Sequence, residues 1–146
     1  MLHVLRDRVP PCVLHAVFTT WSNAWCTDRR FQQDLRDCVL SDSCKGKDEI
    51  EHYLVCRHGF GNLRPKLRLN ASPNHAARAM LLVDGRGDEL ILSAVALYAV
   101  RGVVHKMRAQ NRRASIVQKD LWEQVRVAAM YSGSLNKRLG TLWAGS

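Results

Sequence analysis

Residues 38–56 read Cys38-Val-Leu-Ser-Asp-Ser-Cys44-Lys-Gly-Lys-Asp-Glu-Ile-Glu-His52-Tyr-Leu-Val-Cys56, which sets three thiols and one imidazole within nineteen residues. Structural zinc binds such side chains, because it takes Cys sulfur and His nitrogen in a closed tetrahedral set. The stretch therefore predicts a Zn²⁺ site with the ligands Cys38, Cys44, His52 and Cys56. His52 and Cys56 lie four residues apart, so on a helix they share one face and can close on one ion.

A second interpretation of the same stretch stays open. Five residues separate Cys38 from Cys44, where a gap of about two to four is typical of zinc ligands. Cysteine is also a small hydrophobe that is often buried, so both cysteines can be core residues beside a surface imidazole at His52. His58, two residues beyond Cys56, is the substitute ligand if one of the four fails.

Upstream, residues 21–32 read Trp21-Ser-Asn-Ala-Trp25-Cys26-Thr27-Asp-Arg29-Arg30-Phe31-Gln32. Followed by Cys38, Cys44 and the segment Glu51-His52-Tyr53-Leu54-Val55-Cys56, this run resembles the region after the polymerase domain in non-LTR retrotransposon reverse transcriptases, especially those of dinoflagellate genomes. In that family a WCTxRRFQ-like segment precedes a Cys-Cys-His-Cys zinc knuckle that ends in a HYxxC-like motif. The resemblance covers about residues 12 to 60, and the family's first cysteine pair is usually tighter than the one here.

The resemblance implies a nucleic-acid-binding accessory segment that holds RNA or DNA beside the polymerase domain of a parent protein. It also implies that Zn²⁺ stabilises the segment through the Cys-Cys-His-Cys set. The alternative is a metal-free helical remnant of a decayed retroelement, which only packs against the polymerase domain or another protein. The zinc content of the purified protein separates the two.

The charge is strongly positive, with 22 Lys and Arg against 13 Asp and Glu, a net charge of +9. No acidic residue lies between Glu51 and Asp84, nor between Glu89 and Asp120, so two basic patches are expected for a polyanionic partner. The cations predicted to contact nucleic acid are Arg57, Arg64, Lys66, Arg68, Lys106, Arg108, Arg112 and Arg113. For the stretch 106–113, a solvated helix face whose cations complement the helix dipole is an equal alternative.

No group of residues predicts catalysis. Polymerases and many nucleases need carboxylates that converge on two metal ions, whereas Asp48 and Asp88 are expected at helix starts and Asp84 in a Gly-rich turn. Cys12 or Cys26 could act as a nucleophile with His15 as its base, but no carboxylate in the sequence is placed to orient the imidazole. We therefore expect no enzyme activity and assign no catalytic residue.

Cysteine usage and hydropathy indicate the compartment. The five cysteines are odd in number and no secretory signal precedes them, so an intracellular location is expected. Within the cell we expect the nucleus. The apolar run from Leu90 to Val100 has about 11 residues against the roughly 20 that cross a bilayer. It predicts a core helix and no membrane partner.

The expected fold is mainly α, one helical unit with a small zinc-stapled Cys/His insert. Its parts are an N-terminal helix and packing segment (1–34), the knuckle-like insert (35–60), a basic helical tail (61–131) and a flexible C-terminus (132–146). Helices are expected over 11–26, 49–56, 73–83, 88–110 and 115–131, with an irregular connector over 57–72.

Individual side chains complete these expectations. Asp48 is the expected N-cap of the short helix at 49–56, and Lys45-Gly46-Lys47 is the expected turn before it. Trp21 and Trp25 are expected to be buried. For Tyr53, core packing and stacking on an unpaired base are equally open.

Overall fold

The computed structural model describes residues 2–27, 31, 36–69, 87–110 and 117–143. The helices in these ranges are α1 (Leu2–Arg6), α2 (Pro11–Trp21), α3 (Ile50–Val55), α4 (Phe60–Lys66), α6 (Gly87–Ala109), α7 (Val117–Met130) and α8 (Gly133–Trp143). Within them the β pairing is limited to one isolated antiparallel bridge between Asp37 and Lys47. The predicted mainly α fold is confirmed.

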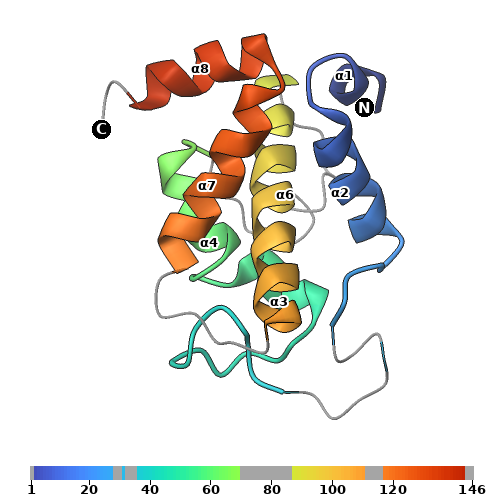
Figure 1. Ribbon diagram of the computed structural model, residues 1–146, viewed down its shortest axis with the longest axis vertical. Coiled ribbons are helices and arrows are strands. Elements are labelled where there is room, and N and C mark those ends of the chain that lie inside the picture. Colours follow the sequence, from blue (N-terminus) through green and yellow to red (C-terminus); the bar gives the residue numbers. More distant parts are fainter. Residues whose placement is uncertain (1, 28–30, 32–35, 70–86, 111–116, 144–146) are drawn as a thin grey trace.

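The long helix α6 forms the centre of the molecule, with α2 and α7 packed on either side and α4 behind (Figure 1). From Leu90 to Val100 every residue except Tyr98 is buried, as expected for a helix enclosed by others, and beyond Val100 the buried residues are Val103, Val104 and Met107. By length and composition α6 could cross a membrane, but 72% of its apolar 18-residue window is buried inside the protein. The core helix predicted over 88–110 is thus confirmed.

Helix α2 ends five residues before its predicted boundary. Asn23 adopts a left-handed conformation with φ of 50°, and the N–H of Ala24 donates to the carbonyl of Thr19 at 2.7 Å. This arrangement is a Schellman cap, which satisfies the last carbonyls and stops the helix. Trp25 is fully buried, as expected, but it reaches the core from the loop and donates from its indole N–H to Thr20 at 2.9 Å.

The prediction of an irregular connector over 57–72 is wrong, because α4 occupies Phe60–Lys66. Leu63 and Leu67 are fully buried, and their burial outweighs the weak helix propensity of the neighbouring glycines. A second Schellman cap ends α4, with Arg68 at φ of 52° and the N–H of Leu69 donating to the carbonyl of Arg64 at 2.9 Å.

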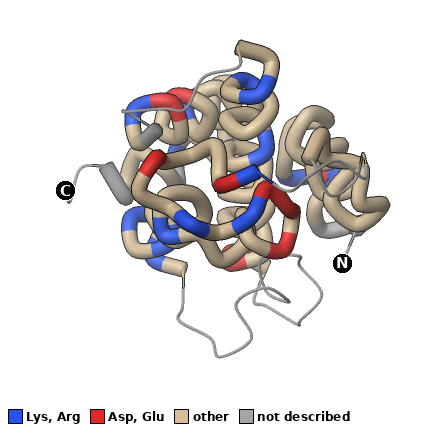
Figure 2. The backbone as a smooth tube through the Cα atoms, turned by 90° about the horizontal axis from the view of Figure 1, so that it is seen from below, with Lys and Arg blue, Asp and Glu red and all other residues tan. Residues whose placement is uncertain are grey.

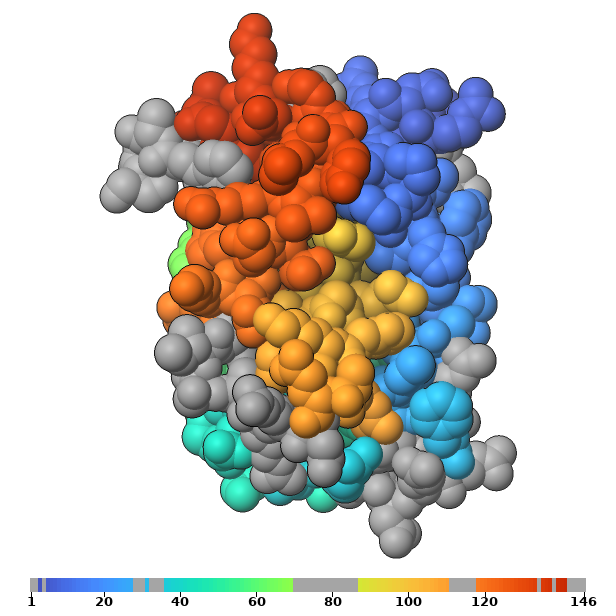
Figure 3. Space-filling view, viewed as in Figure 1, coloured from blue at the N-terminus to red at the C-terminus, as the bar shows by residue number. Residues whose placement is uncertain are grey.

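The flexible C-terminus predicted over 132–146 is wrong for residues 133–143, which form α8. Leu135 and Leu139 lie four residues apart on one helix face, and both are buried against the core. α8 packs on α7, and Figure 3 shows that α7 and α8 cover one side of α6 while α2 covers the other.

The remaining elements complete the comparison with the sequence. The short helix α1 was not predicted; its Leu5 is fully buried. The helix predicted over 115–131 is confirmed as α7 over Val117–Met130, and residues 115–116 lie outside the described ranges. The helix predicted over 73–83 also lies outside the described residues.

Candidate metal centre

A small hairpin without regular strands positions the first two cysteines. The N–H of Cys38 donates to the carbonyl of Gly46 at 2.7 Å, and the N–H of Asp48 donates to the carbonyl of Arg36 at 3.0 Å. At the tip, the N–H of Cys44 donates to the carbonyl of Ser41 at 3.2 Å. This turn reverses the direction of the chain between Cys38 and Cys44, so that both thiols face the same side. The tip lies at Ser41–Cys44 and not at the predicted Lys45-Gly46-Lys47.

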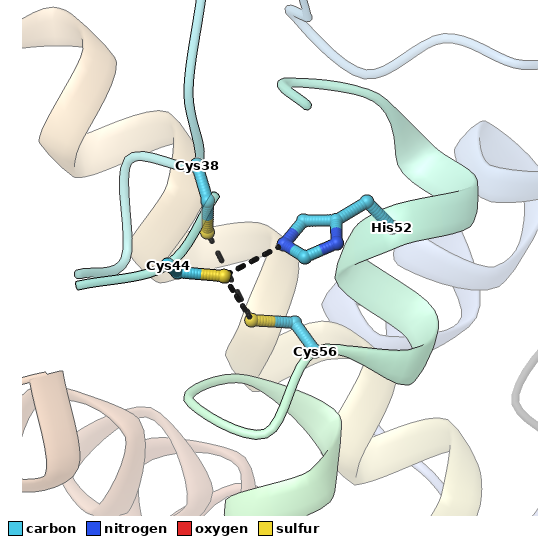
Figure 4. A group of neighbouring side chains, drawn as sticks. All are labelled: Cys38, Cys44, His52 and Cys56. Carbon is cyan, nitrogen blue, oxygen red and sulfur yellow. Dashed lines mark hydrogen bonds between the residues drawn. The ribbon is translucent and has the colours of Figure 1, made fainter. Parts of the chain in front are cut away.

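The other two side chains come from α3. His52 lies in the middle of the helix, and Cys56 is the residue directly after its last turn. The predicted helical spacing of four residues therefore brings the imidazole and the thiol to one side of α3, facing the hairpin (Figure 4).

The four side chains converge on one point (Figure 4). The Sγ of Cys56 lies 3.8 Å from that of Cys38 and 3.9 Å from that of Cys44, and the Sγ of Cys44 lies 3.4 Å from Nε2 of His52. A tetrahedral zinc centre with Zn–S bonds of about 2.3 Å has S···S edges of about 3.8 Å and S···N edges of about 3.6 Å. All four ligand atoms lie within 4.8 Å of one another, so the cluster could hold a metal ion.

Gly46 makes room for the histidine. A Cβ atom at this position would lie 1.9 Å from Cε1 of His52 and 2.1 Å from its Nδ1. The hairpin backbone therefore passes directly against the imidazole ring, which only a residue without a side chain allows. Any side chain at position 46 would therefore require the imidazole of His52 to move.

The thiols of Cys38 and Cys56 share a hydrogen bond that shifts their pKa values in opposite directions. That bond, with a smaller contribution from His52, lowers the pKa of Cys56 to about 3 against the effect of burial. The same bond, followed by burial, raises the pKa of Cys38 well above its ordinary value. Cysteine binds a metal ion as the thiolate, so metal binding at this cluster would release thiol protons and would depend on pH.

A buried ion pair joins this insert to the core helix. The carboxylate of Asp48 is fully buried, pairs with the guanidinium of Arg108 on α6 and accepts a hydrogen bond from the hydroxyl of Tyr53 at 2.5 Å. The prediction that Asp48 caps α3 is wrong, since the N-cap residue is Glu49. Buried carboxylates need such partners, because the desolvation cost of an unpaired charge is several kcal/mol.

Aromatic rings extend the same connection. Tyr53 is fully buried and stacks on Trp25 with ring centroids 6.2 Å apart, so its two open roles resolve to core packing. The ring of Trp25 is also nearly perpendicular to the ring of His105 on α6, with ring centroids 6.5 Å apart. Nε2 of His105 accepts a hydrogen bond from the N–H of Cys26 at 3.3 Å. Burial, followed by the positive charge of Arg101, lowers the pKa of His105 to about 4.

His58, the predicted substitute ligand, does not join the cluster. Its Nε2 accepts a hydrogen bond from Nε of Arg57 at 3.0 Å. The two residues lie in the turn between α3 and α4, where the chain leaves the cluster.

The predicted nucleic-acid contacts occupy different environments, and Figure 2 views the charged positions from the end that carries the insert. Arg57, Lys66 and Arg68 are exposed, and Arg64 is half-buried. Lys106 is paired with Asp120 at 3.0 Å. The expectation for Arg108 needs correction, since its guanidinium is committed to Asp48 and its side chain is only 12% exposed. Arg112 and Arg113 lie outside the described residues.

No pattern in the sequence indicates the contacts that Gly46, Asp48 and Arg108 make in the structure. The sequence predicts only a turn at Gly46, and its contact with His52 arises when the hairpin and α3 meet. Comparison of the chain with family models, curated proteins and solved structures finds no match.

Proposed function

We propose that this chain is a zinc-stapled nucleic-acid-binding segment and that its metal centre is structural. The observation that carries the zinc assignment is the Cys38, Cys44, His52 and Cys56 cluster, whose S···S and S···N separations approach the edges of a zinc tetrahedron. Thiolate and imidazole donors favour zinc over the hard cations that prefer oxygen. Because four protein side chains close the site, no position is left for substrate, and we assign it no catalytic role.

The charge distribution supports the nucleic-acid part of the proposal. The exposed cations Arg57, Lys66 and Arg68 lie within twelve residues after the last ligand, Cys56, on a segment without acidic residues. Cations in such an arrangement neutralise phosphates and release counterions, which gives affinity with little dependence on sequence. A metal ion bound by the four side chains would hold α3 and α4 in place and so would fix the position of these cations. The resemblance to the post-polymerase region of retrotransposon reverse transcriptases agrees with this role and implies RNA or DNA as the partner.

Elemental analysis tests the metal centre. Protein purified in reducing buffer should contain one zinc ion per chain, and Cys56→Ser should lower this content. Because structural zinc contributes directly to folding free energy, chelation should speed amide exchange over residues 35–60 while α6 and α7 stay protected. Absence of zinc from the reduced protein would exclude the assignment.

The salt dependence of binding tests the basic segment. Replacing Arg57, Arg64, Lys66 and Arg68 by Gln should weaken binding to all nucleic-acid sequences similarly. Each lost phosphate contact should reduce the slope of log K against log salt by about 0.7 to 0.9. Lys137→Gln on α8, another exposed cation, is the matched control. An unchanged slope in the multiple variant would exclude this segment as the contact surface.

A protein partner is the second candidate function. The exposed end of α7 favours it, because Met130 and Tyr131 are 80% and 72% exposed. In this alternative the chain is a metal-free helical unit that packs against another protein. Stoichiometric zinc in the purified protein would contradict the metal-free form directly.

A further inference from the structure

A tryptophan and a lysine meet where α4 lies beside α7 (Figure 1). Trp122 on α7 is half-buried, and Nζ of Lys66 on α4 lies over its ring, 5.3 Å from the centroid. Lys66 itself is exposed. An ammonium group over a half-buried indole at this distance is held only by a weak cation–π attraction. A ligand that offers a better partner can therefore displace it from the ring.

Two cations flank this indole on its own helix, with the exposed carboxylate of Glu123 between them in the sequence. Lys119 and Arg126 stand three residues before and four residues after Trp122, which places both on its side of α7. Both are exposed. Lys66, Lys119 and Arg126 thus bring cations from two helices to the surroundings of one aromatic ring, whereas the other described half-buried tryptophan, Trp21, meets the ring of Phe18 edge-on at 5.9 Å.

We propose that Trp122 is a stacking site for an unpaired base of a single-stranded nucleic acid, with Lys66, Lys119 and Arg126 holding the adjacent phosphates. This inference rests on the proposed function and specifies its ligand. An indole face offers any base a stacking partner, and only an unpaired base can reach it. On binding, the Lys66 ammonium leaves the Trp122 ring and contacts a phosphate oxygen. The base then stacks on the ring where the ammonium lay. The cations then supply the salt-dependent part of the affinity.

The test compares two polyanions that differ in whether they carry bases. Full-length, zinc-loaded protein is titrated with an oligothymidylate of about twelve nucleotides and, separately, with heparin. Trp122→Leu should weaken oligothymidylate binding by about 5- to 150-fold, the range for loss of one base–aromatic stack, and change heparin binding little. Trp21→Leu and Lys137→Gln are the matched controls and should change neither.

Intrinsic fluorescence gives a second measurement with a gentler substitution. Oligothymidylate should quench the tryptophan emission of the wild-type protein and of Trp21→Phe, and Trp122→Phe should lose most of this quenching while retaining its helical circular dichroism. Equal loss of heparin and oligothymidylate affinity in Trp122→Leu, or quenching that survives Trp122→Phe, would overturn the inference and leave the proposed function standing. Equal affinity for duplex DNA with the same dependence on Trp122 would exclude an unpaired base. Failure of the wild-type protein to bind either polyanion would overturn both proposals.

Discussion

At the scale of the residue, the geometry of the Cys/His cluster depends on the absence of a side chain at Gly46. The backbone at Gly46 passes against the imidazole of His52 so closely that a methyl group there would lie 1.9 Å from Cε1. Nε2 of the same ring lies 3.4 Å from the Sγ of Cys44, so turning the ring away would break this contact. A ligand is thus oriented here by packing.

We expect Gly46→Ala to weaken metal binding by about 10- to 100-fold, the usual effect of disturbing a group that orients a ligand. The imidazole must move, and the tetrahedral set loses one donor in good geometry. Competition with a chromophoric chelator measures the affinity, and the absorption bands of the Co²⁺-substituted protein report the coordination. Gly133→Ala is the matched control, since nothing lies within 4 Å of a Cβ at that position. Equal Co²⁺ spectra and affinities for the two variants would contradict this role of Gly46.

His105 predicts a pH dependence of stability. Its pKa in the folded protein is about 4, below the ordinary value of 6.5, because burial and Arg101 disfavour the imidazolium. Between these values the unfolded chain binds more protons, so stability falls as the pH drops from about 6.5 to about 4. Above about pH 6.5 the imidazole is neutral in both states and its contribution is complete.

His105→Gln should therefore flatten the pH dependence of the free energy of unfolding over this window. Urea denaturation at pH 7, 5 and 4 measures it, and subtracting the variant from the wild type removes the contribution of the metal ligands. His15→Gln, at an exposed histidine of α2, is the control. Parallel curves for wild type and His105→Gln would show that His105 titrates normally.

At the scale of the element, α8 shows how a short helix joins a core. Its two leucines, Leu135 and Leu139, are 2% and 0% exposed, and they share a face four residues apart. At the start of the helix the N–H of Leu135 reaches the hydroxyl of Ser132 at 3.4 Å. In isolation a helix of this length is marginal in water, so tertiary burial must supply most of its stability.

We expect Leu139→Ala to lower the free energy of unfolding by about 2–5 kcal/mol, the usual cost of a buried leucine truncation. Chemical denaturation measures this loss. Lys137→Ala, on the exposed side of the same helix, should change the stability by less than about 0.5 kcal/mol. A negligible effect of Leu139→Ala would show that α8 is detached in solution.

At the scale of the whole molecule, the insert and the helices share one hydrophobic core. That core runs from Leu5 to Leu139 and includes Cys38 and Cys56 of the Cys/His cluster. Across it, the ion pair between Asp48 and Arg108 ties the hairpin to the C-terminal end of α6. The Cys/His cluster is thereby anchored to the central helix.

Removing only one partner of this ion pair should lower the free energy of unfolding. Arg108→Met leaves a fully buried carboxylate without its cation, and we expect a loss of about 3–5 kcal/mol. The double variant Asp48→Asn with Arg108→Met should recover part of that loss, because no buried charge remains. Denaturation of the four proteins in the cycle gives the coupling energy. Additive single effects would show that the two residues do not interact.

The helical class, the central apolar helix and the four residues of the Cys/His cluster could be predicted from the sequence alone. Each depends on a pattern within one segment: His52 and Cys56 share a helix face, and the run from Leu90 to Val100 is apolar except for Ser93. The features that join distant segments became visible only in the folded structure. Residues 133–143, expected to be flexible, form α8 because Leu135 and Leu139 are buried. Arg108, expected to contact nucleic acid, pairs with Asp48 because α6 packs against the hairpin. Sequence patterns report local periodicity, whereas these contacts gain their free energy only when segments far apart in the chain exclude water together.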